Sequence, residues 1–142
     1  MDSKPRQLTI EMSKRGLTAL RAGSLRVKES VNEALRVALN NCGIDREKVA
    51  RELSRLTGEE ISIHTLNNWC AEGANNRRFP LECAAALSVI TNDKGILDAA
   101  LKIAGFRVLD RGQAAYYELG VLVAEERSRR KRKKEVIDRI GL

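Results

Sequence analysis

The sequence predicts an all-α protein: a compact bundle that contains a helix-turn-helix, followed by a long basic C-terminal helix. Two observations predict this class. From Ser24 onward, apolar residues recur mostly at three- and four-residue steps, which is the spacing of one helix face. Single glycines stand where these periodic segments stop, as they do at helix C-termini. The length of 142 residues suits one compact domain with extensions, or two very small domains.

Three helices are expected in the first half of the chain. The first begins at Ser24, or at Ser30 if the capping-box spacing with Glu33 sets its start. The next two span residues 45–58 and 62–73, and each is opened by an N-cap side chain and closed by a glycine. Their apolar faces are formed by Leu25, Val31, Leu35, Ala38 and Leu39 in the first, Val49, Ala50, Leu53 and Leu56 in the second, and Ile63, Leu66, Trp69 and Cys70 in the third.

Three more helices are expected in the second half. One begins at Pro80, which suits a first helical turn, and runs through residue 90. Another spans residues 92–105, with Asn92 or Asp93 as its N-cap and Gly105 as its stop, and the last spans residues 113–139. Between these two, residues 106–111 alternate in polarity and are expected to form a short extended piece.

Charge is distributed unevenly along the chain, whose formal net charge is +7. Residues 1–28 carry seven basic and two acidic side chains, and residues 112–142 carry eight basic and five acidic ones. Between them, residues 29–111 have a net charge of −1. Positive ends on a nearly neutral centre indicate a polyanionic partner, for which nucleic acid is the first candidate. The alternative is that the basic ends only aid solubility.

Catalysis, a metal centre and a cofactor are not expected. His64 is the single histidine, and the sequence has neither a nucleophile elbow nor a glycine-rich phosphate loop. Cys42, Cys70 and Cys83 include no C-x-x-C pair, so we expect reduced thiols in a non-enzymatic protein. No apolar run is long enough to span a membrane and the N-terminus has no apolar signal region, so a cytoplasmic location is expected.

The helices expected at 45–58 and 62–73 are the two helices of a helix-turn-helix. Ala50 is the small residue that lets them cross closely, and Leu66 and Trp69 anchor the second helix to the core. We assign Trp69 to the core, because five aromatic residues are too few for a single-strand stacking platform. The alternative is an ordinary helix pair whose polar positions meet only water. Asn suits adenine and Thr suits thymine, so the candidate base contacts are the outward polar residues His64, Thr65, Asn67 and Asn68.

Two basic segments are candidate contacts to phosphates, which fix register without reading sequence. Arg77 and Arg78 lie in the polar loop that follows the second helix, and the alternative is an exposed turn. Residues 127–134 are basic at seven of eight positions, and the alternative is a solvated charged helix. The basic residues of this run are Arg127, Arg129, Arg130, Lys131, Arg132, Lys133 and Lys134.

The C-terminal helix also carries an apolar stripe ahead of its basic run. Ala115, Leu119 and Leu122 form this stripe and are the candidate oligomerisation residues. The basic run cannot pack against another copy of itself without repulsion. Because half-sites on duplex DNA are commonly read by two-fold dimers, a homo-oligomer, either a dimer or larger, is expected.

The order of these features resembles the CII-type regulators of temperate bacteriophages and prophages. The resemblance rests on a helix-turn-helix with a conspicuous Trp69 and on the run RRFPLECAAALSVITNDKGILDAALKIAGFRVL at residues 77–109. It covers residues 29–125, and the long turn at residues 55–61 departs from the pattern. It implies a transcriptional regulator that binds operator or promoter DNA as an oligomer. The positions that match its recognition helix are His64, Thr65, Asn67 and Asn68.

The sequence therefore predicts a transcriptional regulator that binds double-stranded DNA sequence-specifically. Residues 1–23 are expected to be a flexible basic segment, and residues 24–111 a helical DNA-binding domain with its helix-turn-helix at about 45–73. Residues 112–142 are the C-terminal helix with the basic run. The alternative function is that of a protein-interaction or assembly factor whose basic tail binds acidic partners.

Overall fold

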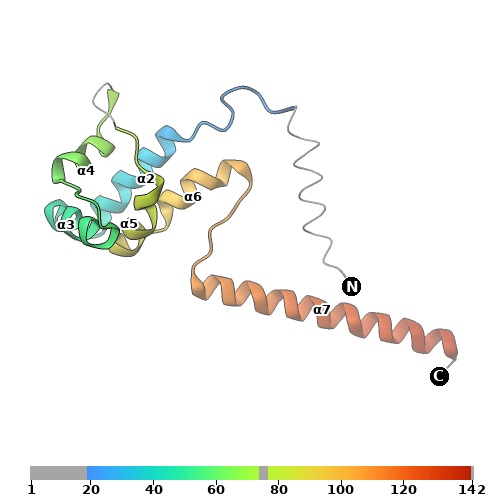
Figure 1. The fold of residues 1–142 in the computed structure, drawn as a ribbon. Coiled ribbons are helices and arrows are strands. Elements are labelled where there is room, and N and C mark those ends of the chain that lie inside the picture. Colours follow the sequence, from blue (N-terminus) through green and yellow to red (C-terminus); the bar gives the residue numbers. More distant parts are fainter. Residues whose placement is uncertain (1–18, 74–76, 142) are drawn as a thin grey trace. The chain divides into compact units, whose positions relative to one another are not determined.

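A computed structural model of the chain describes residues 19–73 and 77–141 (Figure 1). Most of the predicted flexible basic segment, residues 1–18, lies outside the described residues. The chain divides into two compact units, Met1–Phe106 and Arg107–Leu142. The division falls a few residues before the predicted one between residues 111 and 112, because residues 107–110 are grouped with the C-terminal helix.

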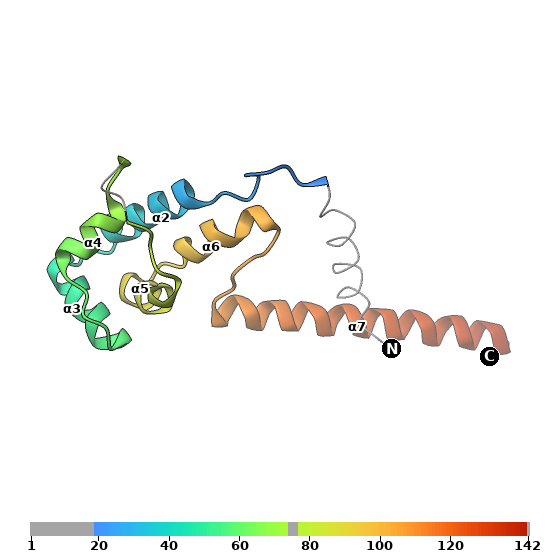
Figure 2. The same cartoon turned by 45° about the horizontal axis from the view of Figure 1, so that its top comes forward.

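Every described element of the first unit is helical, which confirms the predicted all-α class. The elements are α2 (Lys28–Asn41), α3 (Arg46–Thr57), α4 (Ile63–Cys70), the 3-10 turn η3 (Leu81–Cys83), α5 (Ala84–Thr91), α6 (Gly95–Leu101) and the 3-10 turn η4 (Lys102–Ala104). In both ribbon views α2 runs beside α6, and α4 follows α3 after the turn of residues 58–62 (Figures 1 and 2).

The core of the first unit lies where these helices meet. α2 packs along α6, α3 packs against α5, and both α2 and α3 contact α4. Burying one such aliphatic side chain stabilises the fold by roughly 1.5–3 kcal/mol. The largest fully buried side chains are Leu35, Val49, Leu53, Leu66 and Leu87, so α2, α3, α4 and α5 each contribute at least one.

The first helix begins later than Ser24, the first of its two predicted starts. The N–H of Ser24 donates to the Arg21 carbonyl at 3.0 Å, which forms a separate turn before the helix. α2 then begins at Lys28, and Ser30 lies inside the helix instead of capping it. The predicted capping box with Glu33 is therefore not the start of this helix.

The helix predicted at residues 92–105 also begins later, at Gly95. Asn92 adopts a left-handed conformation, with φ of 50°, and closes α5. The Asp93 carboxylate then accepts a hydrogen bond from the Gly95 N–H at 2.7 Å. An Asn tolerates this conformation better than most residues, so it ends one helix here instead of capping the next.

Some residues that the sequence places on apolar faces are exposed. Leu56 in the last turn of α3 is 45% exposed, and Ile63 at the start of α4 is 37% exposed. Leu25 lies ahead of α2 and is exposed as well. Apolar spacing identifies the face of a helix, but the ends of a short helix extend past the core that covers its middle.

The second unit consists of α7 (Arg111–Ile140), preceded by residues 107–110, which form no regular element. A capping box starts the helix: the Asp110 carboxylate accepts from the Gln113 N–H at 2.8 Å, and the Gln113 side chain accepts from the Asp110 N–H at 3.1 Å. This pair sets the start at Arg111, slightly ahead of the predicted one. All 30 residues of α7 are described, and none of them is buried.

Candidate nucleic-acid interface

The turn between α3 and α4 is held by one serine hydroxyl. Ser54 Oγ accepts a hydrogen bond from the Ile61 N–H at 2.9 Å, and its own proton can reach the carbonyl of Ala50 at 2.9 Å or of Ile61 at 3.0 Å. Gly58 ends α3 with φ of 73°, a conformation that favours glycine. Ile61 is only 8% exposed, so it seals the turn against the core. The long turn that the sequence indicates is therefore tied to α3 and to the core.

The inner face of α4 fixes the helix in the first unit. Leu66 is fully buried, and Trp69 is 5% exposed. The Trp69 ring meets the ring of Phe79 edge-on, with ring centroids 5.3 Å apart. The N-cap Ser62 accepts from the Thr65 N–H at 3.1 Å, so the first turn is also closed. The prediction that Trp69 belongs to the core is confirmed.

The four predicted base contacts do not share one environment. His64 and Asn67 are exposed on the outer side of α4. Thr65 is half-buried, and its hydroxyl lies 3.0 Å from the hydroxyl of Ser62 within the N-cap. Asn68 is also half-buried, and its carbonyl accepts a hydrogen bond from the loop that follows. The outer surface of α4 therefore presents His64 and Asn67, with Thr65 and Asn68 at its margins.

Arg46 joins this surface, although the sequence gives no sign of it. It is the first residue of α3, and its Nη1 donates a hydrogen bond to Asn67 Oδ1 at 2.8 Å. The bond fixes which end of the Asn67 amide carries the oxygen, while its NH₂ group can still donate. Since Arg46 and Asn67 are 21 residues apart, only the crossing of α3 and α4 brings them together.

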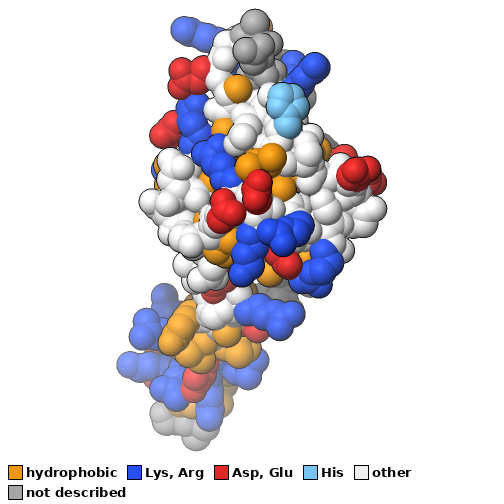
Figure 3. Space-filling view, turned by 90° about the vertical axis from the view of Figure 1, so that its left-hand side faces the viewer, with side chains coloured by type: hydrophobic (Ala, Val, Ile, Leu, Met, Phe, Trp, Pro, Cys, Tyr) orange, Lys and Arg blue, Asp and Glu red, His pale blue; other side chains and the backbone are white. Residues whose placement is uncertain are grey.

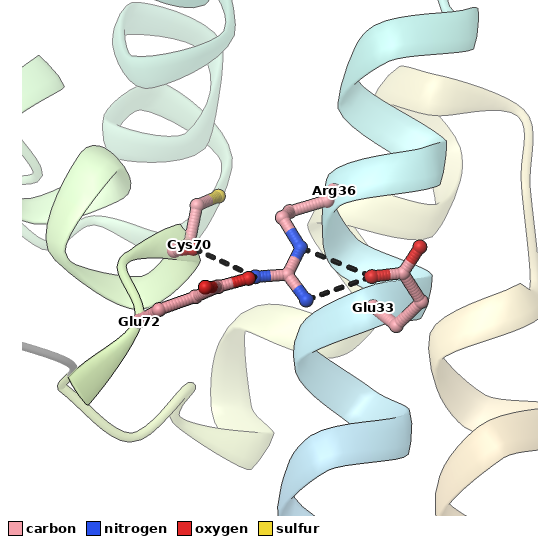
Figure 4. A network of polar contacts seen from close by, with 4 residues as sticks. All are labelled: Glu33, Arg36, Cys70 and Glu72. Atoms are coloured by element: carbon pink, nitrogen blue, oxygen red, sulfur yellow. Dashed lines mark hydrogen bonds and ion pairs between the residues drawn. The ribbon is translucent and has the colours of Figure 1, made fainter.

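A second arginine holds the opposite end of α4 (Figure 4). Arg36 of α2 donates from Nη1 to the Cys70 carbonyl at 3.3 Å and to Glu72 at 3.1 Å, and from Nη2 to Glu33 at 2.7 Å. The hydrogen bond with Glu33 raises the pKa of Arg36. A cation at a helix C-terminus satisfies the last carbonyls, so Arg36 ties the end of α4 to α2.

The predicted phosphate contacts Arg77 and Arg78 are exposed and follow α4 closely. The N–H of Arg77 donates to the Asn68 carbonyl at 2.9 Å, which ties the loop to α4. Arg78 lines an open cavity of about 580 Å³ at the start of α2, together with Arg26 and Lys28. The preceding loop residues 74–76 lie outside the described residues.

In the second unit, all seven residues of the basic run are exposed on α7. Arg130 makes an ion pair with Glu126 one turn earlier, at 2.7 Å. The predicted oligomerisation residues are exposed too, with Leu119 at 56% and Leu122 at 62%. Within α7, therefore, neither the basic run nor the apolar stripe is covered.

Charge is mixed on the side of the first unit that carries α3 and α4 (Figure 3). Basic and acidic side chains alternate over this side, and the single histidine lies on it. α4 itself has no acidic residue in its first turn and no lysine or arginine in its last. No large basic field covers this side of the unit.

Among the described residues, no cluster of three or more His, Cys, Asp or Glu side chains could hold a metal ion. Cys70 and Cys83 are buried thiols, and burial raises the pKa of both. Arg36 and Arg46 oppose this shift at Cys70 but do not reverse it. Neither thiol is therefore set up as a thiolate nucleophile. Among the described helices, none is both long and apolar enough to cross a membrane.

Comparisons with known proteins returned no matching family model, curated protein or solved structure for this chain.

Proposed function

We propose that the protein is a non-enzymatic transcriptional regulator that binds double-stranded DNA sequence-specifically, of the type that the CII-like sequence features suggest. The observation that supports this proposal is that α4 is anchored by a buried inner face and presents polar side chains on its outer face. Leu66 and Trp69 fix its inner side, while His64 and Asn67 face outward next to Arg46. A short helix held by its buried face and bearing exposed amide and imidazole groups has the chemistry of a major-groove reader.

Asn67 is the principal base contact in this proposal. A bidentate contact to adenine needs the amide oxygen to accept from N6 and the amide nitrogen to donate to N7. Because Arg46 holds the oxygen at one side, it sets the amide orientation before DNA arrives. An amide oxygen accepts two hydrogen bonds, so the bond with Arg46 is compatible with a second one to adenine.

Phosphate contacts would come from both units. The backbone of Arg77 is held close to α4 by its bond to the Asn68 carbonyl, and Arg78 follows it, which suits contacts that set the register of the helix on DNA. The exposed basic run of α7 would add sequence-independent attraction by releasing counterions. An oligomer formed through α7 would let one assembly read two half-sites.

The experiment that tests this function compares duplex DNA with an acidic protein-like partner. The purified chain, freed of nucleic acid in high salt, is incubated with random-sequence duplexes and separately with polyglutamate. The proposal predicts that repeated selection enriches a common duplex sequence. An assembly factor with a basic tail would bind both polyanions equally at low salt and enrich no sequence, and that result would reject the proposal.

A further inference from the structure

Exposed apolar residues lie on one face of α7 in two groups, one near each end of the helix. Ala115, Leu119, Leu122, Val136 and Ile140 are all exposed. They share one heptad register, the seam of the helix: the steps within each group are three or four residues, and the step from Leu122 to Val136 is two whole heptads. Such spacing is typical of a helix that packs along one other helix. A single helix of 30 residues with no buried side chain lacks the packing that normally stabilises it.

The middle of this seam is charged, and its charges determine which orientation a second copy can adopt. The seam positions between the two apolar ends are Glu126, Arg129 and Lys133. In a parallel, in-register pair each would lie against the same residue of the partner helix. Three consecutive layers would then hold like charges, which is destabilising in a coiled coil.

An antiparallel pair removes all three conflicts. In an antiparallel coiled coil, each a position of one helix packs against a d position of the partner. In α7 the a positions are Leu119, Glu126, Lys133 and Ile140, and the d positions are Ala115, Leu122, Arg129 and Val136. The register that matches the apolar ends places Leu119 against Val136 and Ala115 against Ile140. The same register places Glu126 against Arg129 and lets the aliphatic stem of Lys133 cover Leu122.

The residues beside the seam agree with this register. In an antiparallel pair, the g positions, each of which directly precedes an a position, face the g positions of the partner. Here these positions place Glu118 opposite Arg139 and Glu125 opposite Arg132. On the other flank Tyr116 lies opposite Ile137. Each of these contacts would occur twice because the pair is two-fold symmetric.

We propose that the occupant of this seam is a second copy of the chain, with the two α7 helices antiparallel and Glu126 facing Arg129 of the other copy. The inference deepens the oligomer of the proposed function, but it does not depend on DNA. It also reconciles the two predicted roles of α7. Arg127, Lys131 and Lys134 lie at positions that point away from the seam, so they remain available to phosphates.

Thiol crosslinking tests the orientation. Ala115→Cys and Ile140→Cys are prepared separately in a chain whose half-buried Cys42 is replaced by Ser, leaving the two buried cysteines in place. A short bismaleimide should crosslink only the mixture of the two variants, without DNA. The parent without added cysteine is the control. Crosslinking of either variant alone would mean a parallel pair, and no crosslinking of the mixture would mean another occupant; both results overturn the proposal.

A charge exchange tests the register independently. Glu118 and Arg139 lie about 30 Å apart along one helix, so they can compensate each other only between copies. Glu118→Arg and Arg139→Glu should each weaken dimerisation about tenfold, because two attractive contacts become repulsive. The double variant should regain the original dimerisation constant in sedimentation equilibrium. A double variant weaker than either single one would overturn the register.

Asp138→Arg is the matched control for Glu118→Arg, because it changes the charge equally at a position that faces away from the seam. We expect it to leave dimerisation unchanged. If it weakens dimerisation as much as Glu118→Arg does, net charge and not the proposed register controls association. All of these measurements are made without DNA, so their failure leaves base recognition by α4 untouched, and failure of DNA selection leaves the antiparallel pair untouched.

Discussion

Arg46 and Asn67 form a pair in which one residue orients the other. The 2.8 Å bond from the guanidinium to the amide oxygen restricts an exposed side chain that would otherwise rotate. Residues joined in this way contribute non-additively to binding. In the proposed function, Arg46 is therefore a positioning residue for the base contact that we assign to Asn67.

Replacing Arg46 with Met should reduce discrimination at the base pair that Asn67 reads, because Met keeps much of the length but cannot donate. Affinities of Arg46→Met, Asn67→Ala and the double variant give the coupling, which should be about 0.5–3 kcal/mol. Arg51→Met, an exposed arginine of the same helix, separates loss of charge from loss of the contact. Strictly additive effects would show that the bond has no role in recognition.

Trp69 should matter for stability. Trp69→Ala removes a ring that is 5% exposed and packs edge-on against Phe79, so it should lower the free energy of unfolding by roughly 3–5 kcal/mol. Leu81→Ala, at a side chain 76% exposed and outside α7, should change it by less than about 0.5 kcal/mol. Urea denaturation measures both. A Trp69→Ala variant of unchanged stability that has lost DNA binding would place the ring at the interface.

At the scale of elements, local signals predicted the bounds of α3 and the start of α4, but α4 ends at Cys70 and not at the predicted Gly73. Ser62 and Gly58 mark such ends because caps and left-handed stops act within a few residues, while Asp45 stands at the N-cap of α3 without a side-chain cap bond. Contacts between elements could not be predicted in this way. Periodicity tells which face of a helix is buried, but not that Arg36 reaches the carbonyl of Cys70, 34 residues away. Nor does it show that the Thr65 hydroxyl lies within the N-cap of its own helix.

Arg36 should stabilise the last turn of α4 against local opening. Arg36→Met removes the donor to the Cys70 carbonyl, so the last turn of α4 should open more often and its amides should exchange faster with solvent. Arg36→Lys keeps the charge but not the fork that reaches Glu33 and Cys70 together, and should restore protection only in part. Hydrogen exchange resolved by residue measures this. Unchanged exchange in Arg36→Met would mean that buried Leu66 and Trp69 hold α4 alone.

The outward cations of α7 should contribute to affinity without contributing to sequence preference. Replacing Arg127, Lys131 and Lys134 with Gln should lower the slope of log affinity against log salt by up to about 2.7 per chain. The selected DNA sequence should stay the same, because phosphates carry no sequence information. Filter binding over a salt series gives the slope. An equal slope of log affinity against log salt in the wild type and the triple variant would mean that these cations do not contact phosphates.

At the scale of the whole molecule, the all-α class followed directly from helical spacing and glycine stops. The start of α2 could not be predicted, because the turn that ends at Ser24 depends on a backbone hydrogen bond to Arg21, and residue types do not indicate this bond. The sequence also predicted one long C-terminal helix, but not that none of its side chains is buried. α7 is uncovered and carries apolar residues on one face, whereas α4 is anchored to the core and exposes amide groups. We therefore propose separate roles for the two units. One unit would read DNA while the other pairs copies.

The role that we propose for α4 is to read bases through Asn67. Its most direct test is selection from random duplex DNA with the wild-type chain, with Asn67→Ala, and with Asn40→Ala as a control at an exposed asparagine of α2. We predict a common sequence for wild type and control. Asn67→Ala should lose preference at one A·T pair, a loss of about 1–3 kcal/mol in discrimination, and keep the rest. Identical selected sequences for all three chains, or no enrichment with wild type, would contradict the claim.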